Sequence, residues 1–129
     1  MGKINYKDST LLLLRVAIAL IFIYHGSQKL MNASGTMSFF TSLGLPGWAG
    51  VIIGIIEVVA GLLVLSGFYY KWANYVLALV MVGALILVQI PGVFKSGAIG
   101  AGFERDVLIL ITTLVLASNG PGHFSIHKK

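Results

Sequence analysis

Four long apolar runs constrain this chain more than any other feature of its sequence. A helix rises about 1.5 Å per residue, so about 20 predominantly apolar residues cross the roughly 30 Å hydrocarbon core of a bilayer. Backbone groups in lipid need partners within the protein, which favours helices. The sequence therefore predicts an all-α integral membrane protein, a four-helix bundle that forms one transmembrane domain over residues 1–129. The predicted spans are roughly 9–31, 47–67, 72–90 and 103–118.

The composition agrees with a bilayer as the solvent, because 57% of the residues are hydrophobic and only 10% are charged. The basic residues are scattered at span ends, so the net charge of +5 follows from membrane topology and nucleic-acid binding is not expected. The larger group of basic residues predicts that both termini lie in the cytoplasm. That group is Lys3, Lys7, Arg15, Lys71, Lys128 and Lys129, against Lys29, Lys95 and Arg105 on the outer side.

The connections between spans carry local signals. Residues 32–46 are expected to form a short helix in the outer interface, and the aromatic residues of 68–72 are expected at a headgroup belt. Pro91 and Gly92 are predicted to stop the third span. Arg15 is expected to extend its side chain to the inner headgroups.

Glu57 is the one ionisable residue between Gly47 and Gly67. It lies ten residues from either end of that run, so a helix places its carboxyl group near the middle of the hydrocarbon core. A carboxylic acid at that depth costs about 3 kcal/mol to insert, and it needs a partner, a bound proton or a water-filled cavity. Glu57 is therefore the first candidate for a functional residue.

Each predicted span carries one polar or small stripe when its residues are placed about 100° apart. The glycines that share a face with Glu57 predict close approach of a neighbouring helix. All four stripes are expected to face protein. They comprise Arg15, Ile18, Phe22, His25 and Lys29; Gly50, Gly54, Glu57 and Gly61; Asn74, Ala78, Met81, Leu85 and Gln89; and Asp106, Leu110, Thr113 and Ala117.

The predicted helix directions bring several polar residues to the outer half of the bilayer. The expected arrangement is a polar vestibule that opens outward, with Glu57 at its floor and Asp106 near its edge. A purely structural polar cluster is the alternative. The candidate catalytic residues are His25, Lys29 and Glu57, and the candidate cofactor-binding residues are His25, Gln89, Glu104 and Arg105.

The chain contains no cysteine, which excludes disulfides, thiolate nucleophiles, Fe–S clusters and c-type haem attachment. A haem held between two spans needs paired histidines, and His25 is the only histidine within a span. No metal, haem or Fe–S cluster is therefore expected. Any redox role requires a bound organic cofactor or a partner.

Four motifs, in order, resemble the pattern of the DoxX family of small four-helix membrane proteins. The resemblance covers nearly the whole chain, although the family commonly ends its last motif in Ser-Leu-Asp where this chain has Ser125-Ile126-His127. The motifs are His25-Gly26-x-x-Lys29-Leu30, Glu57-x-x-x-Gly61-Leu62-Leu63 through Gly67, Gly102-x-Glu104, and Gly120-Pro121-Gly122-x-x-Ser125.

This resemblance implies a quinone-linked redox role, because relatives include a subunit of an archaeal thiosulfate:quinone oxidoreductase. The leading hypothesis is a membrane subunit that binds quinone or quinol in the outward vestibule, or handles a sulfur oxyanion such as thiosulfate. His25 and Lys29 would donate to a quinone carbonyl, while Glu57 or Glu104 relays protons. An enzyme of this kind would be an oxidoreductase subunit with quinone as acceptor, and its partners would be other redox subunits or further copies of the chain.

Two other functions remain open. A non-enzymatic scaffold or assembly factor would dock a partner's membrane anchor and use the polar cluster only for its own packing. A proton-coupled carrier of small solutes is the third reading, although four spans give little room for alternating access without dimerisation.

Overall fold

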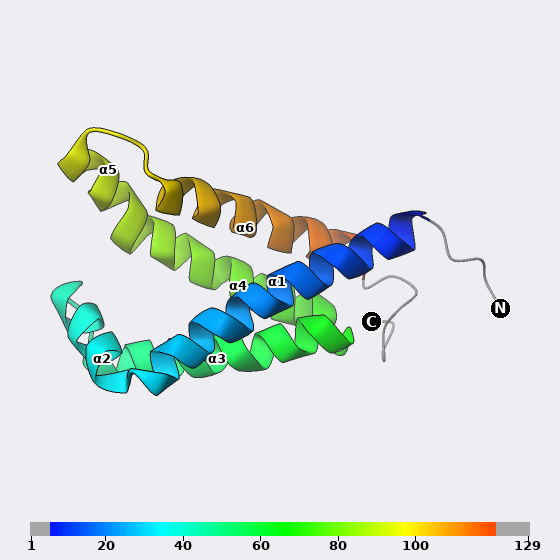
Figure 1. The fold of residues 1–129 in the computed structure, drawn as a ribbon, viewed down its shortest axis with the longest axis horizontal. Helices are drawn as coiled ribbons and strands as arrows, with labels where there is room; N and C mark the ends of the chain where they lie inside the picture. Colours follow the sequence, from blue (N-terminus) through cyan, green and yellow to red (C-terminus); the bar gives the residue numbers. More distant parts are fainter. Residues whose placement is uncertain (1–5, 121–129) are drawn as a thin grey trace.

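The computed structural model describes residues 6–120, and the regular structure in this range is entirely helical, which confirms the predicted all-α membrane fold (Figure 1). Three stretches, Tyr6–Met31, Gly47–Ser66 and Tyr70–Ser96, are long and apolar enough to cross a membrane. The elements are α1 (Tyr6–Met31), α2 (Ala33–Ser42), α3 (Gly47–Ser66), α4 (Tyr70–Ala84), the π-helix η1 (Leu85–Gln89), α5 (Ile90–Ser96) and α6 (Ala101–Asn119).

The helix α6 corresponds to the fourth predicted span. Its position in the fold matches the prediction, while its crossing of the membrane and the cytoplasmic location of the termini stay predictions. The C-terminal motif from Pro121 onward, with the basic residues at both ends of the chain, lies outside the described residues.

The helices form two pairs, α1 with α3 and α4 with α6. The pairs meet where α3 turns into α4 and where α1 contacts α6, and they diverge toward the end that carries α2 and α5 (Figure 1). Apolar side chains from all four long helices fill the space between the pairs at the closed end. They include Leu11, Ile18, Phe22, Val64, Leu77 and Leu116.

The close packing of α1 on α3 depends on glycines. A Cβ atom on Gly26 would lie 2.6 Å from the backbone oxygen of Gly54, and one on Gly61 would lie 2.9 Å from Ile23 Cγ1. Only hydrogen fits at these crossings, so the two backbones approach closely. This contact confirms the prediction that the small-residue face around Glu57 is aimed at another helix.

Arg15 corrects one expectation. Its side chain does not extend to the headgroups: the residue is 1% exposed, its Nε donates to Val64 O at 3.2 Å, and its Nη2 donates to Leu65 O at 2.7 Å. The last carbonyls of a helix have no partner within the helix and carry the negative end of its dipole. A buried guanidinium on α1 therefore caps the C-terminus of α3.

The prediction that Pro91 and Gly92 stop the third span is wrong, because the helix continues to Ser96. In a regular α-helix the ring of Pro91 would clash with the carbonyl of Leu87. Here the preceding turn is a π-helix, in which Ile90 N–H donates to the Leu85 carbonyl five residues earlier. The wider turn accommodates the proline without ending the helix.

The short connections also differ in part from expectation. Residues 32–46 do contain the predicted short helix, α2, which begins where the Asn32 side chain accepts from Gly35 N–H; its interfacial location stays a prediction. Among the aromatic residues of 68–72, Phe68, Tyr69 and Trp72 are exposed, but Tyr70 is fully buried and its hydroxyl donates to the Leu116 carbonyl. Tyr70 therefore packs inside the protein, while the location of this turn at a headgroup belt stays a prediction.

Candidate functional site

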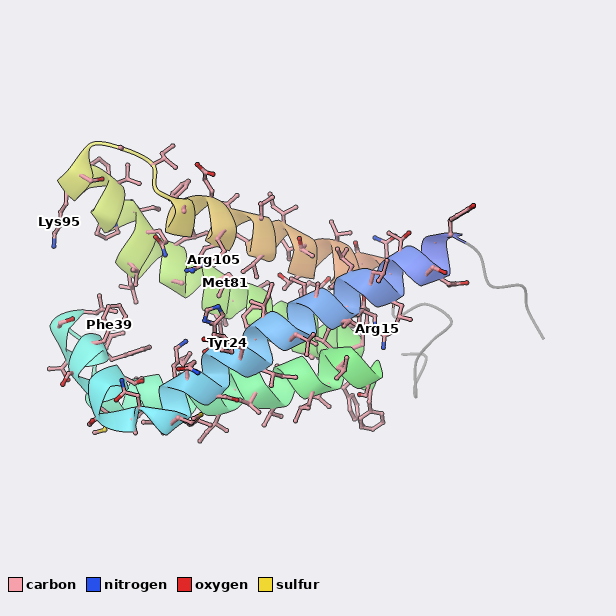
Figure 2. All side chains as sticks on the ribbon, viewed as in Figure 1. Arg15, Tyr24, Phe39, Met81, Lys95 and Arg105 are labelled. Atoms are coloured by element: carbon pink, nitrogen blue, oxygen red, sulfur yellow. The ribbon has the colours of Figure 1, made fainter. Side chains whose placement is uncertain are left out.

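A cavity of about 510 Å³ lies between the two helix pairs, toward the end that carries α2. Its walls come from α1, α2, α3, α4, η1 and α6 and are mostly aliphatic and aromatic. Figure 2 shows Phe39 on α2 and Arg105 on α6 reaching toward this space from opposite sides. The polar side chains in the wall are His25, Lys29, Glu57, Gln89, Arg105 and Asp106.

An ion pair joins α1 to α3 in the cavity wall. Lys29 Nζ lies 2.7 Å from Glu57 Oε1, and Glu57 is 2% exposed. Gly54, one turn before Glu57, leaves room for the stem of Lys29, since a Cβ there would lie 3.0 Å from Lys29 Cβ. The mid-span acid thus has a cation as its partner, as its depth in the membrane requires.

Asp106 is the second buried acid of the wall, and it joins α6 to η1. Gln89 Nε2 donates to its Oδ2 at 2.9 Å, and Arg105 Nε lies 3.0 Å from its Oδ1. Gly102 packs directly on the Gln89 amide, because a Cβ there would lie 2.9 Å from Oε1. Sequence reasoning placed Asp106 near the vestibule but did not select it as a site residue, although it shares a stripe with the buried Thr113 and Ala117.

His25 lines the same cavity as these two polar pairs. Its ring makes an edge contact with Tyr24, with centroids 5.5 Å apart. Lys29 follows it by one helical turn on α1. An imidazole can both donate and accept a proton, so His25 adds a proton-exchanging group to the wall.

The charges of the cavity are balanced. Each acid, Glu57 and Asp106, has its own base, Lys29 and Arg105. Lys95, which the sequence grouped with them on the outer side, lies at the far tip of α5 and is not part of the wall (Figure 2). This arrangement suits a neutral ligand with polar atoms better than an anion, which would have to compete with a carboxylate for each cation.

The structure brings together five of the six predicted site residues, namely His25, Lys29, Glu57, Gln89 and Arg105. Glu104 is different: it is exposed on the first turn of α6 and does not line the cavity. The catalytic and cofactor-binding roles assigned to all six stay predictions. Within residues 6–120, no group of three or more His, Asp or Glu side chains gathers as metal ligands.

The cavity also opens sideways. Val76 and Leu79 on α4 belong to its wall and are 41% and 71% exposed. In a membrane-spanning helix such exposed apolar side chains face lipid. A molecule in the cavity can therefore extend an apolar part beyond the protein.

The sequence comparison adds the family. The DoxX family model matches residues 10–90, a stretch that includes His25, Lys29, Glu57 and Gln89. The chain belongs to the DoxX family. The matched residues contain most of the cavity wall, so the DoxX portion of the chain and the candidate site largely coincide.

The relatives of this DoxX chain include one from Bacillus subtilis and one from Escherichia coli. The first is 38% identical over 84% of this chain and 78% of its own length, and is named "Putative oxidoreductase CatD" in Bacillus subtilis (strain 168). The second is 31% identical over 92% of this chain and 89% of its own length, and is named "Inner membrane protein YphA" in Escherichia coli (strain K12). No solved structure matches the chain.

Proposed function

We propose that this chain is a membrane subunit of a quinone-linked redox system and that it binds the quinone headgroup between its two helix pairs. The observation that carries the proposal is the charge-balanced cavity of about 510 Å³, with apolar walls and polar groups from both pairs. The oxidoreductase name of one relative supports the redox assignment, and the inner-membrane name of another supports the cytoplasmic membrane of a prokaryote.

The donors in the wall suit the two carbonyl oxygens of a quinone, which point in opposite directions from a flat, neutral ring. His25 and Lys29 approach from α1, and Gln89 and Arg105 approach from η1 and α6. Each carbonyl would accept a hydrogen bond from one side of the cavity. The aliphatic walls between these donors would exclude water from the ring.

Reduction of a quinone to a quinol consumes two electrons and two protons. Glu57 and Asp106 are carboxylates in their ion pairs, so each would first accept a proton and then pass it to the quinone, and His25 in the same wall is a third group that could exchange protons. The chain has no cysteine, so the electrons would come from a partner subunit or from a substrate oxidised there. This requirement is why we propose a subunit of a larger redox system.

A sulfur oxyanion is not part of the proposal. The sequence placed the cations Lys29, Lys95 and Arg105 on the outer side, but two of them are paired with acids and the third lies away from the cavity. If thiosulfate is the electron donor, a partner subunit would have to bind and oxidise it.

The first test is extraction of the protein, purified in native lipid nanodiscs, followed by mass spectrometry of its quinones. Titration with ubiquinone and menaquinone analogues then compares Glu57→Gln with the matched variant Glu104→Gln, whose acid is exposed outside the cavity. We expect Glu57→Gln to weaken binding and Glu104→Gln to leave it unchanged. Equal binding by both variants would remove Glu57 from the site.

A non-enzymatic scaffold is the second candidate, and one observation favours it. Both buried acids bind side chains of neighbouring helices, Glu57 to Lys29 and Asp106 to Gln89. Polar contacts that serve only to hold helices together would have the same form. A scaffold predicts that purification yields partner proteins without quinone. It also predicts that His25→Asn leaves function intact in any variant that still folds.

A further inference from the structure

A second groove, of about 520 Å³, lies along α3 and α4 toward the turn that joins them. Ile55, Val59 and Leu63 on α3 face Trp72 on α4 across it. Its wall also includes Ala60 and Ala73, which are buried, so their small side chains give the groove its depth. The site already described does not account for this groove.

The groove and the polar cavity are adjacent, because Ile56 and Val76 belong to the walls of both. No charged residue belongs to the wall of the groove. From Ile56 to Leu63 the wall extends along about 10 Å of helix, at about 1.5 Å per residue. A molecule with its polar end beside Glu57 could thus place a long apolar chain in the groove without leaving protein contact.

We infer that the α3–α4 groove holds the apolar tail of the molecule whose headgroup occupies the cavity, which identifies the ligand as a long-tailed quinone. This inference rests on the proposed function and deepens it. A hydrocarbon tail gains favourable contacts along the aliphatic walls, and the small base formed by Ala60 and Ala73 admits a chain of narrow cross-section. Tyr69 and Trp72 mark the end of the groove beside the turn.

The test uses two substitutions on exposed positions of α3, so that neither disturbs the core. Val59 and Leu62 are both 51% exposed, but only Val59 lines the groove. Val59→Phe should partly fill the groove, whereas Leu62→Phe adds an aromatic ring nearby on the same helix. Binding of a polyprenyl quinone and of its short-tailed analogue is measured for each variant in nanodiscs of identical lipid, so that partitioning of the ligand into lipid cancels between variants.

We expect Val59→Phe to weaken binding of the polyprenyl quinone about tenfold and to leave the short-tailed analogue unchanged. Leu62→Phe should change neither. A polyprenyl quinone with a photoreactive group on its tail should crosslink to residues 59–63 and 69–73.

Three outcomes would overturn the inference. If both analogues bind equally well and Val59→Phe affects neither, the groove holds bilayer lipid and the proposed headgroup site survives alone. If crosslinks map outside the groove, the tail lies elsewhere. If neither analogue binds at all, the proposed function fails and the tail site fails with it.

Discussion

Lys29 Nζ and Glu57 Oε1, 2.7 Å apart, connect the two most closely packed helices of the bundle beside the candidate cavity. The pair places the only acid of α3 against the only base in the last turn of α1. Because the pair lies both at a helix contact and in the cavity wall, it can contribute to helix packing, to ligand binding or to both. Stability measurements test the first role and ligand titration tests the second.

Breaking the pair from one side should destabilise the protein more than removing both charges. Lys29→Met leaves the Glu57 carboxylate without its cation, at a cost of about 2 kcal/mol. The double variant Lys29→Met/Glu57→Gln should recover at least half of that loss. Unfolding in mixed micelles measures stability, and quinone titration measures binding; we expect binding to stay impaired in the double variant. Full recovery of binding would assign the pair to packing alone.

The glycine contact between α1 and α3 gives a prediction with an internal control. Gly26→Ala places a Cβ 2.6 Å from the Gly54 backbone oxygen, so the helices must separate, and we expect a loss of about 1–3 kcal/mol. Gly83→Ala, in the interior of α4, meets nothing within 4 Å and should be neutral or slightly stabilising. Thermal unfolding in detergent compares them. Similar losses in the two variants would contradict the close-packing explanation.

Gly102→Ala should affect the cavity without affecting the fold. The added methyl group would lie 2.9 Å from Gln89 Oε1, so the Gln89 side chain must rotate and its hydrogen bond to Asp106 is lost. We expect weaker quinone binding, similar to that of Gln89→Ala, and a loss of stability of about 1 kcal/mol in both variants from the missing hydrogen bond. Gly100→Ala, which meets nothing within 4 Å, should bind normally. Normal binding by Gly102→Ala would show that Gln89 does not contact the ligand.

The buried hydroxyl of Tyr70 should contribute to stability. Tyr70→Phe removes the hydroxyl that donates to the Leu116 carbonyl, so this carbonyl loses its side-chain hydrogen bond. We expect the free energy of unfolding to fall by about 1 kcal/mol. Tyr75→Phe, on the exposed side of the same helix, is the matched control and should cost less than half as much. Equal losses would mean that the bond to Leu116 adds no net stability.

Periodicity predicted the faces of the helices well. The stripe around Glu57 is buried throughout, and Asn74 and Thr113 lie on the buried faces of their helices as expected. The rotation of about 100° per residue in an α-helix assigns each residue to one face. In lipid, the face that carries polar or small residues packs against protein, so the buried face can be recognised from the sequence.

The differences from expectation have two causes, a partner distant in the sequence and a local change of helix type. Arg15 is buried because the end of α3 supplies two carbonyl acceptors, and nothing in the first span indicates them. Pro91 does not end its helix because the preceding residues adopt a π-helical turn. Asp106 and Glu104 are close in sequence, and periodicity assigned Asp106 to the protein-facing stripe; the packing of α6 on α4 then places this acid in the cavity wall.

The sideways opening at Val76 and Leu79 determines which ligand concentration sets the occupancy of the site. An apolar molecule that arrives through hydrocarbon partitions strongly into the bilayer, so its relevant concentration is its mole fraction among the lipids. That concentration is much higher than its concentration in water. The site therefore needs only weak intrinsic affinity to stay occupied, and exchange of oxidised for reduced ligand can be correspondingly fast.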